Sequence, residues 1–318
     1  MKLANALWVT VAVMGGIACF AGGDHSAAFK NAQTKGADAR IRLCVHDERG
    51  TPIADASIRA TLANRVSDYS MRGVTDANGI YVVSGSTTGD YLQFLVAKAG
   101  YYDSWEGMSF IEMGKEHEVA DGKWQPFDAV HSIVMRRVQN PAASEIGRGN
   151  FALTKHLNCW LGFDMQKHDF VRPYGGGEVP DFEVMIDWNG KWYPEYTGMG
   201  INLRFTMPYS GYYEMPVNPV SKFKGPYAAD VEKTFCQSAT FDEQVVNPTK
   251  RIRHPFNANK CWVVRSRCKV DDKGKLTSAN YSIIHKINFC GKPDGRGGLR
   301  LTGAYNPAPN DTNLEPKR

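Results

Sequence analysis

The sequence lacks the short motifs that identify many hydrolases and nucleotide-binding proteins. It has no GxSxG nucleophile elbow, no HExxH zinc helix, no EF-hand loop and no glycine-rich loop that ends in GK[ST]. The cysteines are not arranged as CxxC, and the histidines do not lie at zinc-ligand spacings beside them. We therefore predict no catalytic residue, no metal site and no cofactor.

Long uncharged segments are also scarce, because only the N-terminal segment approaches the length of a membrane span. A lysine, an apolar run and small residues make up the three-part pattern of a secretory signal. We expect residues 1–23 to be a signal peptide that is cleaved near Ala21. Two alternatives stay open. One is an uncleaved anchor, and the other is lipidation of Cys19, because Gly16-Ile17-Ala18-Cys19 resembles a lipobox and departs from it at Gly16.

Each of these alternatives places the body of the protein outside the cytoplasm, in the periplasm, at the outer membrane or in the medium. Membrane contact is then expected only through the signal or a lipid anchor. The net charge is about −3 over residues 38–138 and about +6 over residues 150–318. A polyanion partner would fit this positive excess, but we favour an ordinary solvated face. Export argues further against nucleic acid as the partner.

Six cysteines follow the expected signal, and an even number in an exported chain indicates disulfides. Residues 261–289 have the pattern of a hairpin around a turn at 271–275. Folding this hairpin about its centre predicts a disulfide between Cys261 and Cys290. Cys261 cannot pair with Cys268, because residues seven apart on one strand point to opposite faces. The partners of the other cysteines stay open.

Residues 38–138 show the short alternating strands and tight turns of a β-sandwich. Apolar and polar residues alternate from Ile41 to Val45 and again from Ala56 to Ala60. Gly50 and the Asn78-Gly79 pair supply turns, since glycine adopts positive φ without strain.

Three motifs in this region resemble the carboxypeptidase regulatory-like family, which is also called transthyretin-like or prealbumin-like. They are Val45-x-Asp47-x-x-Gly50-x-Pro52-Ile53-x-x-Ala56-x-Ile58, Thr75-Asp76-x-Asn78-Gly79-x-Tyr81 and Val96-x-Lys98-x-Gly100-Tyr101. The resemblance implies a Greek-key β-sandwich. It implies no activity, because the motif residues of that family form turns and core, and such domains serve as spacers or binding modules.

The stretch from Tyr101 to Asp128 is long and contains Trp105, Phe110, Met113 and Trp124. We favour an elaborated loop that covers one end of the sandwich. The alternative is a loop that contacts a ligand, because loops of exported proteins often carry recognition.

We interpret residues 139–150 as a linker. Residues 151–318 have no sustained helical periodicity, and we interpret them as a second β-rich domain. The fold class is therefore all-β. Phe182, Val184 and Ile186 share one face of a strand, which is typical of a sheet with one side in water. The expected strands are 158–163, 181–188, 201–206, 261–269, 280–289 and 299–305, with one helical turn at 228–235.

Two segments of this domain resemble an exported bacterial family of unknown function. They are Lys167-His168-Asp169-Phe170-Val171-Arg172-Pro173-Tyr174-Gly175-x-Gly177-x-x-x-Asp181 and Tyr305-Asn306-Pro307-Ala308-Pro309-Asn310-Asp311-Thr312-Asn313-Leu314-Glu315. The resemblance implies no activity. We expect an irregular turn at 173–177 rather than a phosphate cradle. In the C-terminal segment we expect caps and turns rather than calcium ligands.

The candidate binding site is aromatic. Trp188, Trp192, Tyr193 and Tyr196 surround an Asn-Gly turn, and exposed rings of this kind commonly hold sugars and peptides. Packing of these rings at a hairpin end is the alternative. The binding hypothesis predicts an exported cell-envelope protein whose partner is a carbohydrate or a cell-surface protein.

Two further hypotheses belong to other classes. A glycosidase-like hydrolase would need a carboxylate pair in the second domain, for example Asp181 with Glu183 or Asp187 with Glu195, held about 5–10 Å apart in a cleft. A structural module would instead show a broad exposed apolar patch and no cleft.

Overall fold

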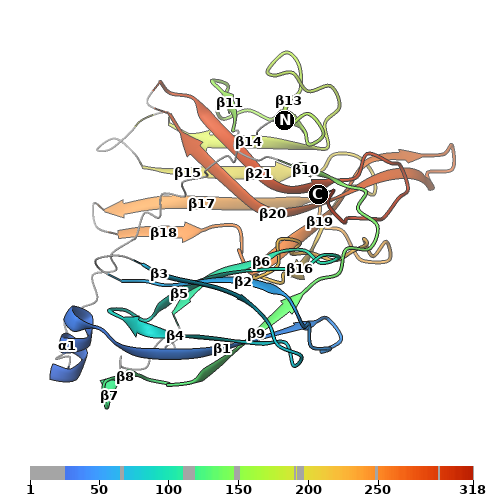
Figure 1. Cartoon of the computed structure of the whole chain (residues 1–318). Coiled ribbons are helices and arrows are strands. Elements are labelled where there is room, and N and C mark those ends of the chain that lie inside the picture. Colours follow the sequence, from blue (N-terminus) through green and yellow to red (C-terminus); the bar gives the residue numbers. More distant parts are fainter. Residues whose placement is uncertain are drawn as a thin grey trace, which may run out of the picture.

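The structure is a computed structural model that describes residues 26–64, 68–109, 119–146, 151–189, 191, 197–247, 250–292 and 294–317. These residues form one helix, α1 (Ala27–Lys35), and four sheets in which antiparallel pairing predominates. Figure 1 shows two layered β-structures, one above the other. The predicted all-β class is confirmed. No helix in the described part of the chain is long and apolar enough to cross a membrane.

The first sandwich is made of two sheets. Sheet 1 has the order β4-β1-β8-β7 with β9 beside β1, and sheet 2 has the order β3-β2-β5-β6. Alternation along β1 turns Ile41, Leu43 and Val45 into a shared core with Ile58 and Phe94 of sheet 2. The strands are β1 (Ala37–Asp47), β2 (Ser57–Leu62), β3 (Tyr69–Val74), β4 (Ile80–Thr87), β5 (Tyr91–Ala97), β6 (Ser104–Ser109), β7 (Val119–Ala120), β8 (Lys123–Trp124) and β9 (Ala129–Met135).

The turn residues of this sandwich act as the sequence predicts. The Asp47 carboxylate accepts hydrogen bonds from the backbone N–H groups of Arg49 (2.9 Å) and Thr51 (3.0 Å). Gly79 has φ 73°, and a Cβ at this position would lie 2.3 Å from the Val45 carbonyl oxygen. Only glycine fits such a position.

The stretch after Tyr101 is partly sheet, where a loop was expected, because it contributes β6, β7 and β8. Trp124 does cover one end of the sandwich: its Nε1 donates to the Thr87 carbonyl (2.9 Å), and its ring meets Phe29 of α1 edge-on at 5.8 Å. Trp105 is 59% exposed on β6. Phe110 and Met113 lie outside the described residues.

The second sandwich also has two sheets. Sheet 3 has the order β10-β21-β20-β19-β16 with β11 beside β21, and sheet 4 has the order β13-β12-β14-β15-β17-β18. Phe182, Val184 and Ile186 are buried on one face of β14, as predicted, and pack against sheet 3 residues such as Trp262 and Leu301. The strands are β10 (Ser144–Ile146), β11 (Ala152–Thr154), β12 (Leu161–Asp164), β13 (Asp169–Phe170), β14 (Phe182–Trp188), β15 (Gly198–Arg204), β16 (Gly211–Pro216), β17 (Ser238–Asn247), β18 (Lys250–His254), β19 (Lys260–Val270), β20 (Leu276–Gly291) and β21 (Gly297–Tyr305).

The hairpin of β19 and β20 forms around its predicted turn, but the predicted disulfide does not. Trp262 pairs with Ile284, so that Cys261 falls beside His285, whereas Cys290 lies further along β20 and pairs with Gly298 of β21. All six described cysteines are free thiols. Burial raises the pKa of Cys261 to about 11. The Cys261–Cys290 prediction is wrong because the turn is centred on residue 273, so that strand pairing places Cys261 opposite position 285, five residues before Cys290.

The outer face of sheet 3 packs against the segment 217–236 and the C-terminal segment, through residues such as Ala229 and Leu314. The predicted helical turn at 228–235 is absent from this described segment, because Ala228 pairs with Asn313 in an isolated bridge. Asn306 donates from Nδ2 to the Asn313 carbonyl (2.8 Å), and Asn310 Oδ1 accepts from the Ala279 N–H (3.0 Å). These polar side chains act as caps and turns, as predicted.

Candidate functional site

Two hollows of similar size are candidates for a ligand site. A crevice of about 440 Å³ lies between the first sandwich and the segment 215–226, and a groove of about 390 Å³ lies on the outer face of sheet 4. Pockets between domains and grooves on sheets both occur as binding sites. The two hollows differ in whether their polar groups are already paired within the protein or are available to a ligand.

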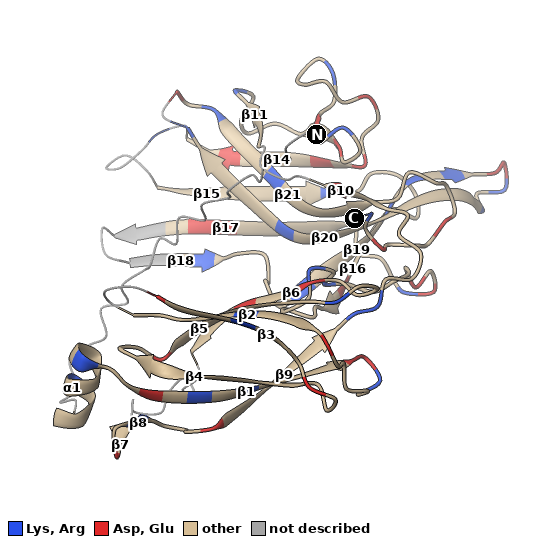
Figure 2. Ribbon diagram, viewed as in Figure 1, with Lys and Arg blue, Asp and Glu red and all other residues tan. Residues whose placement is uncertain are grey.

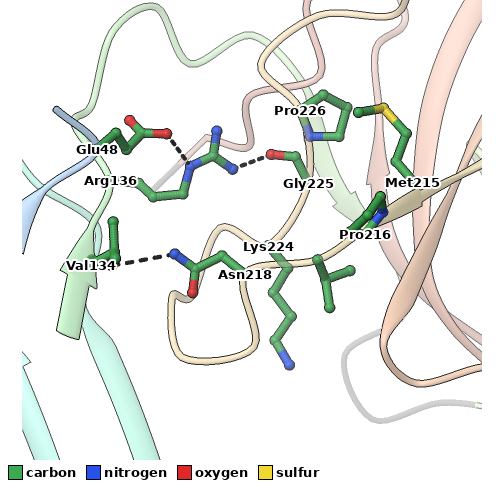
Figure 3. Close-up of a pocket in the computed structure, with 10 residues that line it drawn as sticks. Glu48, Val134, Arg136, Met215, Pro216, Asn218, Lys224, Gly225 and Pro226 are labelled. Atoms are coloured by element: carbon green, nitrogen blue, oxygen red, sulfur yellow. Dashed lines mark hydrogen bonds and ion pairs between the residues drawn. The ribbon is translucent and has the colours of Figure 1, made fainter. Parts of the chain in front are cut away.

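Arg136 dominates the crevice, and Figure 3 shows its guanidinium pointing to Glu48 and to the Gly225 carbonyl. Its Nε donates to Glu48 Oε1 at 2.9 Å. The guanidinium also lies 4.3 Å from the ring centres of both Phe223 and Tyr227. Arg136 is therefore committed to holding the segment around Gly225 against the first sandwich.

The other polar groups of the crevice leave little for a ligand. The Asn218 amide donates to the Val134 carbonyl at 3.3 Å, which adds a second link between the sandwich and this segment (Figure 3). Lys224 extends away from Arg136 in the same view. Because these contacts join parts of the protein, we assign the crevice a structural role.

The groove on sheet 4 is built by the register of three neighbouring strands. Asp187 of β14 pairs with Gly200 of β15, which pairs with Asp242 of β17. Asn202 and Thr240 form the next cross-strand pair on the same face, since side chains two residues apart share a face. Figure 2 shows acidic positions on both β14 and β17. Two carboxylates thus face each other across a glycine.

The hollow exists because β15 has glycine at two alternate positions. Gly198 and Gly200 present no side chain, so the floor of the groove is backbone. A Cβ at Gly200 would meet nothing closer than 3.6 Å. Neighbouring strands lie about 4.8 Å apart, which places the Asp187 and Asp242 backbones about 10 Å from each other. The hollow above this floor has a volume of about 390 Å³.

The groove offers hydrogen-bonding groups of both kinds. Asp187 is exposed, and its carboxylate has no partner among the described residues. Asp242 accepts from His254 Nδ1 (2.7 Å) and from Gln244 Nε2 (2.9 Å), so it is held in place. Asn202 Oδ1 accepts from the Thr240 hydroxyl (2.8 Å), which leaves its amide N–H groups to donate.

The structure changes the predicted aromatic site. Trp188 is only 2% exposed, because it belongs to the buried face of β14, and its Nε1 donates to the Lys191 carbonyl (3.2 Å). It lines the end of the groove without offering an open ring face. Trp192, Tyr193 and Tyr196 lie outside the described residues, as do Glu195 and Cys19. Asn189 and Thr197, which flank the connection 190–196, both line the groove.

The hydrolase hypothesis paired Asp181 with Glu183, but the structure places their side chains on opposite faces of the strand. Asp181 is buried and accepts from Arg267 Nε (3.0 Å) and from the Ser266 hydroxyl (2.6 Å). Glu183 pairs with Arg204 at 2.6 Å on the outer face of sheet 4. Neighbouring residues of a strand point to opposite faces, so these two carboxyls cannot act on one substrate.

The motif that contains Pro173 forms an irregular turn, as predicted. The Asp169 carboxylate accepts from the backbone N–H groups of Phe170 (2.8 Å) and Gly176 (2.8 Å). A Cβ at Gly175 would lie 2.4 Å from the Phe170 carbonyl oxygen. These glycines therefore let the backbone pack against itself.

Comparison with solved structures gives distant similarity to β-sandwich proteins. The chain is similar to 3-chlorocatechol 1,2-dioxygenase from Rhodococcus opacus at 18% identity, over 32% of this chain and 61% of the dioxygenase, with a TM-score of 0.26. A streptococcal ancillary pilin matches at 13% identity over 64% of this chain and 62% of the pilin, with a TM-score of 0.23. A DUF3823 family protein from Parabacteroides merdae matches at 5% identity over 85% of this chain and 98% of that protein, with a TM-score of 0.21.

These similarities carry no argument about function. The chain spans less than two thirds of the dioxygenase and of the pilin. No family model matches the sequence, and no curated protein matches it.

Proposed function

We propose that this protein is an exported cell-envelope protein that binds carbohydrate in the groove across β14, β15 and β17. The observation that carries the proposal is the row Asp187–Gly200–Asp242, which places two carboxylates on either side of a floor without side chains. Sugar hydroxyl groups donate to carboxylates and accept from amides. Asn202 and Thr240 supply such groups beside the row.

The sequence supports the location and the type of protein. The N-terminal segment has the pattern of a secretory signal, and its Cys19 ends a run that resembles a lipobox. The motifs of residues 45–101 resemble a transthyretin-like family whose domains often serve as binding modules. Trp192, Tyr193 and Tyr196 belong to the connection between two groove-lining residues, which keeps the aromatic hypothesis compatible with this site.

Binding fits the groove better than hydrolysis does. Inverting glycosidases need two carboxyl groups about 6.5–9.5 Å apart. The backbones of Asp187 and Asp242 lie about 10 Å apart across Gly200, so a carboxylate pair is available in the groove. A general acid, however, works best in a desolvated site, where its pKa is raised. Asp187 is exposed, and Asp242 is paired with His254. The pair therefore suits recognition of hydroxyl groups.

A glycan array followed by calorimetry with the best-bound glycan tests the proposal. Asp187→Ala removes hydrogen bonds to a charged group, which contribute about 1.5–3 kcal/mol each, so we expect affinity to fall at least tenfold. Gly200→Leu should abolish binding, because its side chain fills the groove without a backbone clash.

Thr240 and Ser238 provide a matched pair, because they share one face of β17 and only Thr240 lines the groove. Thr240→Ala should weaken binding, and Ser238→Ala should not. Glycan binding that survives Gly200→Leu would refute this site.

A further inference from the structure

The outer face of sheet 2 carries a second, unrelated group of surface residues. Trp105 of β6 pairs with Leu95 of β5, and Leu95 pairs with Arg59 of β2. Arg59 in turn pairs with Arg72 of β3. One row across four strands therefore runs from an indole to two guanidinium groups.

Trp105 has the properties of a ligand contact. Its side chain is 59% exposed, although tryptophan is usually among the more buried residues. Its backbone is fixed on both sides, by pairing with Leu95 and by donation of its N–H to the Val220 carbonyl (2.9 Å). The ring is thus held on a rigid strand while its face is open to solvent.

The two arginines have an unusual arrangement. Arg59 and Arg72 lie directly opposite each other on neighbouring strands, where like charges destabilise a sheet. Both are exposed, and neither has an acidic partner among the described residues. A sequence that keeps such a pair departs from the local rule, and departures of this kind occur at functional sites.

The neighbouring row completes a polar surface. Gln93 pairs with Thr61, and the Thr61 hydroxyl lies 2.9 Å from the Ser70 hydroxyl. Tyr91 is 40% exposed and lies over Gly107, where a Cβ would be 2.2 Å from the tyrosine oxygen. Aromatic, amide and hydroxyl groups therefore lie beside the arginines on one sheet face.

We propose that the outer face of sheet 2 binds a carboxylated polysaccharide, with a sugar ring on Trp105 and carboxylates on Arg59 and Arg72. Guanidinium groups bind carboxylates through two parallel hydrogen bonds, and indole rings stack on flat apolar faces. At about 4.8 Å per strand, Trp105 lies about 10 Å from Arg59 and about 14 Å from Arg72. A polymer with several sugar rings can span this row.

Charge complementarity selects an anionic ligand. The carboxylates would lie between two cations that repel each other in the unliganded protein, so binding relieves that repulsion. This site is independent of the proposed function, because it lies on the first sandwich and the groove lies on the second.

Binding of the full-length protein to polygalacturonate tests the proposal, with methyl-esterified polygalacturonate as the matched polymer whose carboxylates are neutral. We expect binding to polygalacturonate and at least tenfold weaker binding to the ester. Trp105→Ala and Arg59→Gln should each reduce binding at least tenfold. The exposed residues Val130 and Arg49 supply controls, and Val130→Ala and Arg49→Gln should have no effect.

A third variant separates binding from folding. Arg72→Thr should weaken binding and raise the melting temperature of the unliganded protein, because it removes the like-charge pair. Equal binding of polygalacturonate and its ester would overturn the proposal, as would binding of dextran sulfate without polygalacturonate. Loss of polygalacturonate binding in Gly200→Leu, with Trp105→Ala unaffected, would assign the ligand to the groove and also overturn it.

Discussion

Arg267 shows how a single side chain organises the second sandwich. It lies in a β19 bulge with φ 50°, and its guanidinium reaches Asp164 Oδ1 (2.7 Å) and Asp181 Oδ1 (3.0 Å). Burial by itself would raise the pKa of Asp164, but backbone N–H groups and Arg267 lower it overall. Burial raises the pKa of Asp181 despite Arg267. One arginine thus binds two carboxylates whose pKa values are shifted in opposite directions.

His285 is half-buried, and its buried Nδ1 has no hydrogen-bond partner among the described residues. Burial lowers its pKa to about 4, and the charges of Lys224 and Arg136 act in the same direction. The imidazole is therefore neutral in the folded protein near neutral pH.

His285 should make the protein sensitive to acid. The unfolded chain binds a proton near pH 6.5 and the folded chain only near pH 4, so the stabilisation is complete above pH 6.5 and is lost as pH falls toward 4. At about 1.4 kcal/mol per pH unit, this amounts to about 3 kcal/mol. His285→Gln should lose correspondingly less unfolding free energy between pH 7 and pH 4 in urea titrations.

His156 is exposed and serves as the control for this measurement. His156→Gln should keep the acid sensitivity of the unaltered protein. An identical loss of stability in all three proteins would show that His285 titrates normally.

Strand β15 shows how one element shapes a site. Its apolar residues Met199, Ile201 and Leu203 face the core, whereas Gly198, Gly200 and Asn202 face outward. The two glycines differ in whether the backbone and its surroundings would accept a side chain. Gly198 has φ 147° and lies against the Glu243 carbonyl, where a Cβ would be 2.4 Å away, whereas a Cβ at Gly200 would make only ordinary contacts, the nearest at 3.6 Å.

Substitution of each glycine by alanine should change the unfolding free energy by different amounts. Gly198→Ala should lower the unfolding free energy by about 2 kcal/mol, because it forces strain on the backbone. Gly200→Ala should leave stability within about 0.5 kcal/mol or raise it slightly. Chemical denaturation measures both, and equal effects would contradict the assignment of Gly200 as the tolerant position in the groove.

The two sandwiches are joined by more than the linker. The buried carboxylate of Glu315 accepts from the backbone N–H groups of Gln139 (2.8 Å) and Asn140 (2.6 Å). The Tyr102 hydroxyl of the first sandwich donates to the same carboxylate at 3.0 Å. The C-terminal segment thus fixes the linker against the first sandwich, close to the crevice that Arg136 lines.

Removal of this carboxylate should loosen the whole molecule. Glu315→Ala leaves two linker N–H groups without partners, and we expect it to lower the unfolding free energy by about 3 kcal/mol and to speed proteolysis within residues 139–150. Tyr102→Phe should cost about 1 kcal/mol. The exposed Glu232 is the control, and Glu232→Ala should change neither quantity. Unchanged proteolysis in Glu315→Ala would show that the linker is held by other contacts.

Local patterns were sufficient to predict the fold class and several elements. Alternation identified β1, β2 and β14, and the turn residues Asp47, Gly79 and Asp271 act as expected, the last by accepting from the Lys273 and Lys275 N–H groups. Such features depend on neighbours within a few residues, so the chain encodes them directly. Helix α1 was missed because its pattern is short and weakly amphipathic.

The candidate site needed the tertiary structure. Asp187 and Asp242 are far apart in the chain and meet across Gly200 only because three strands pair in one register. In the same way, the register of the β19–β20 hairpin placed Cys261 opposite position 285 and not opposite Cys290. A shift of one residue in strand pairing exchanges the two faces of a strand, and alternation alone does not say which distant strand lies alongside. The local sequence pattern therefore determined which segments form strands, and the long-range pairing of those strands determined which side chains meet in the groove.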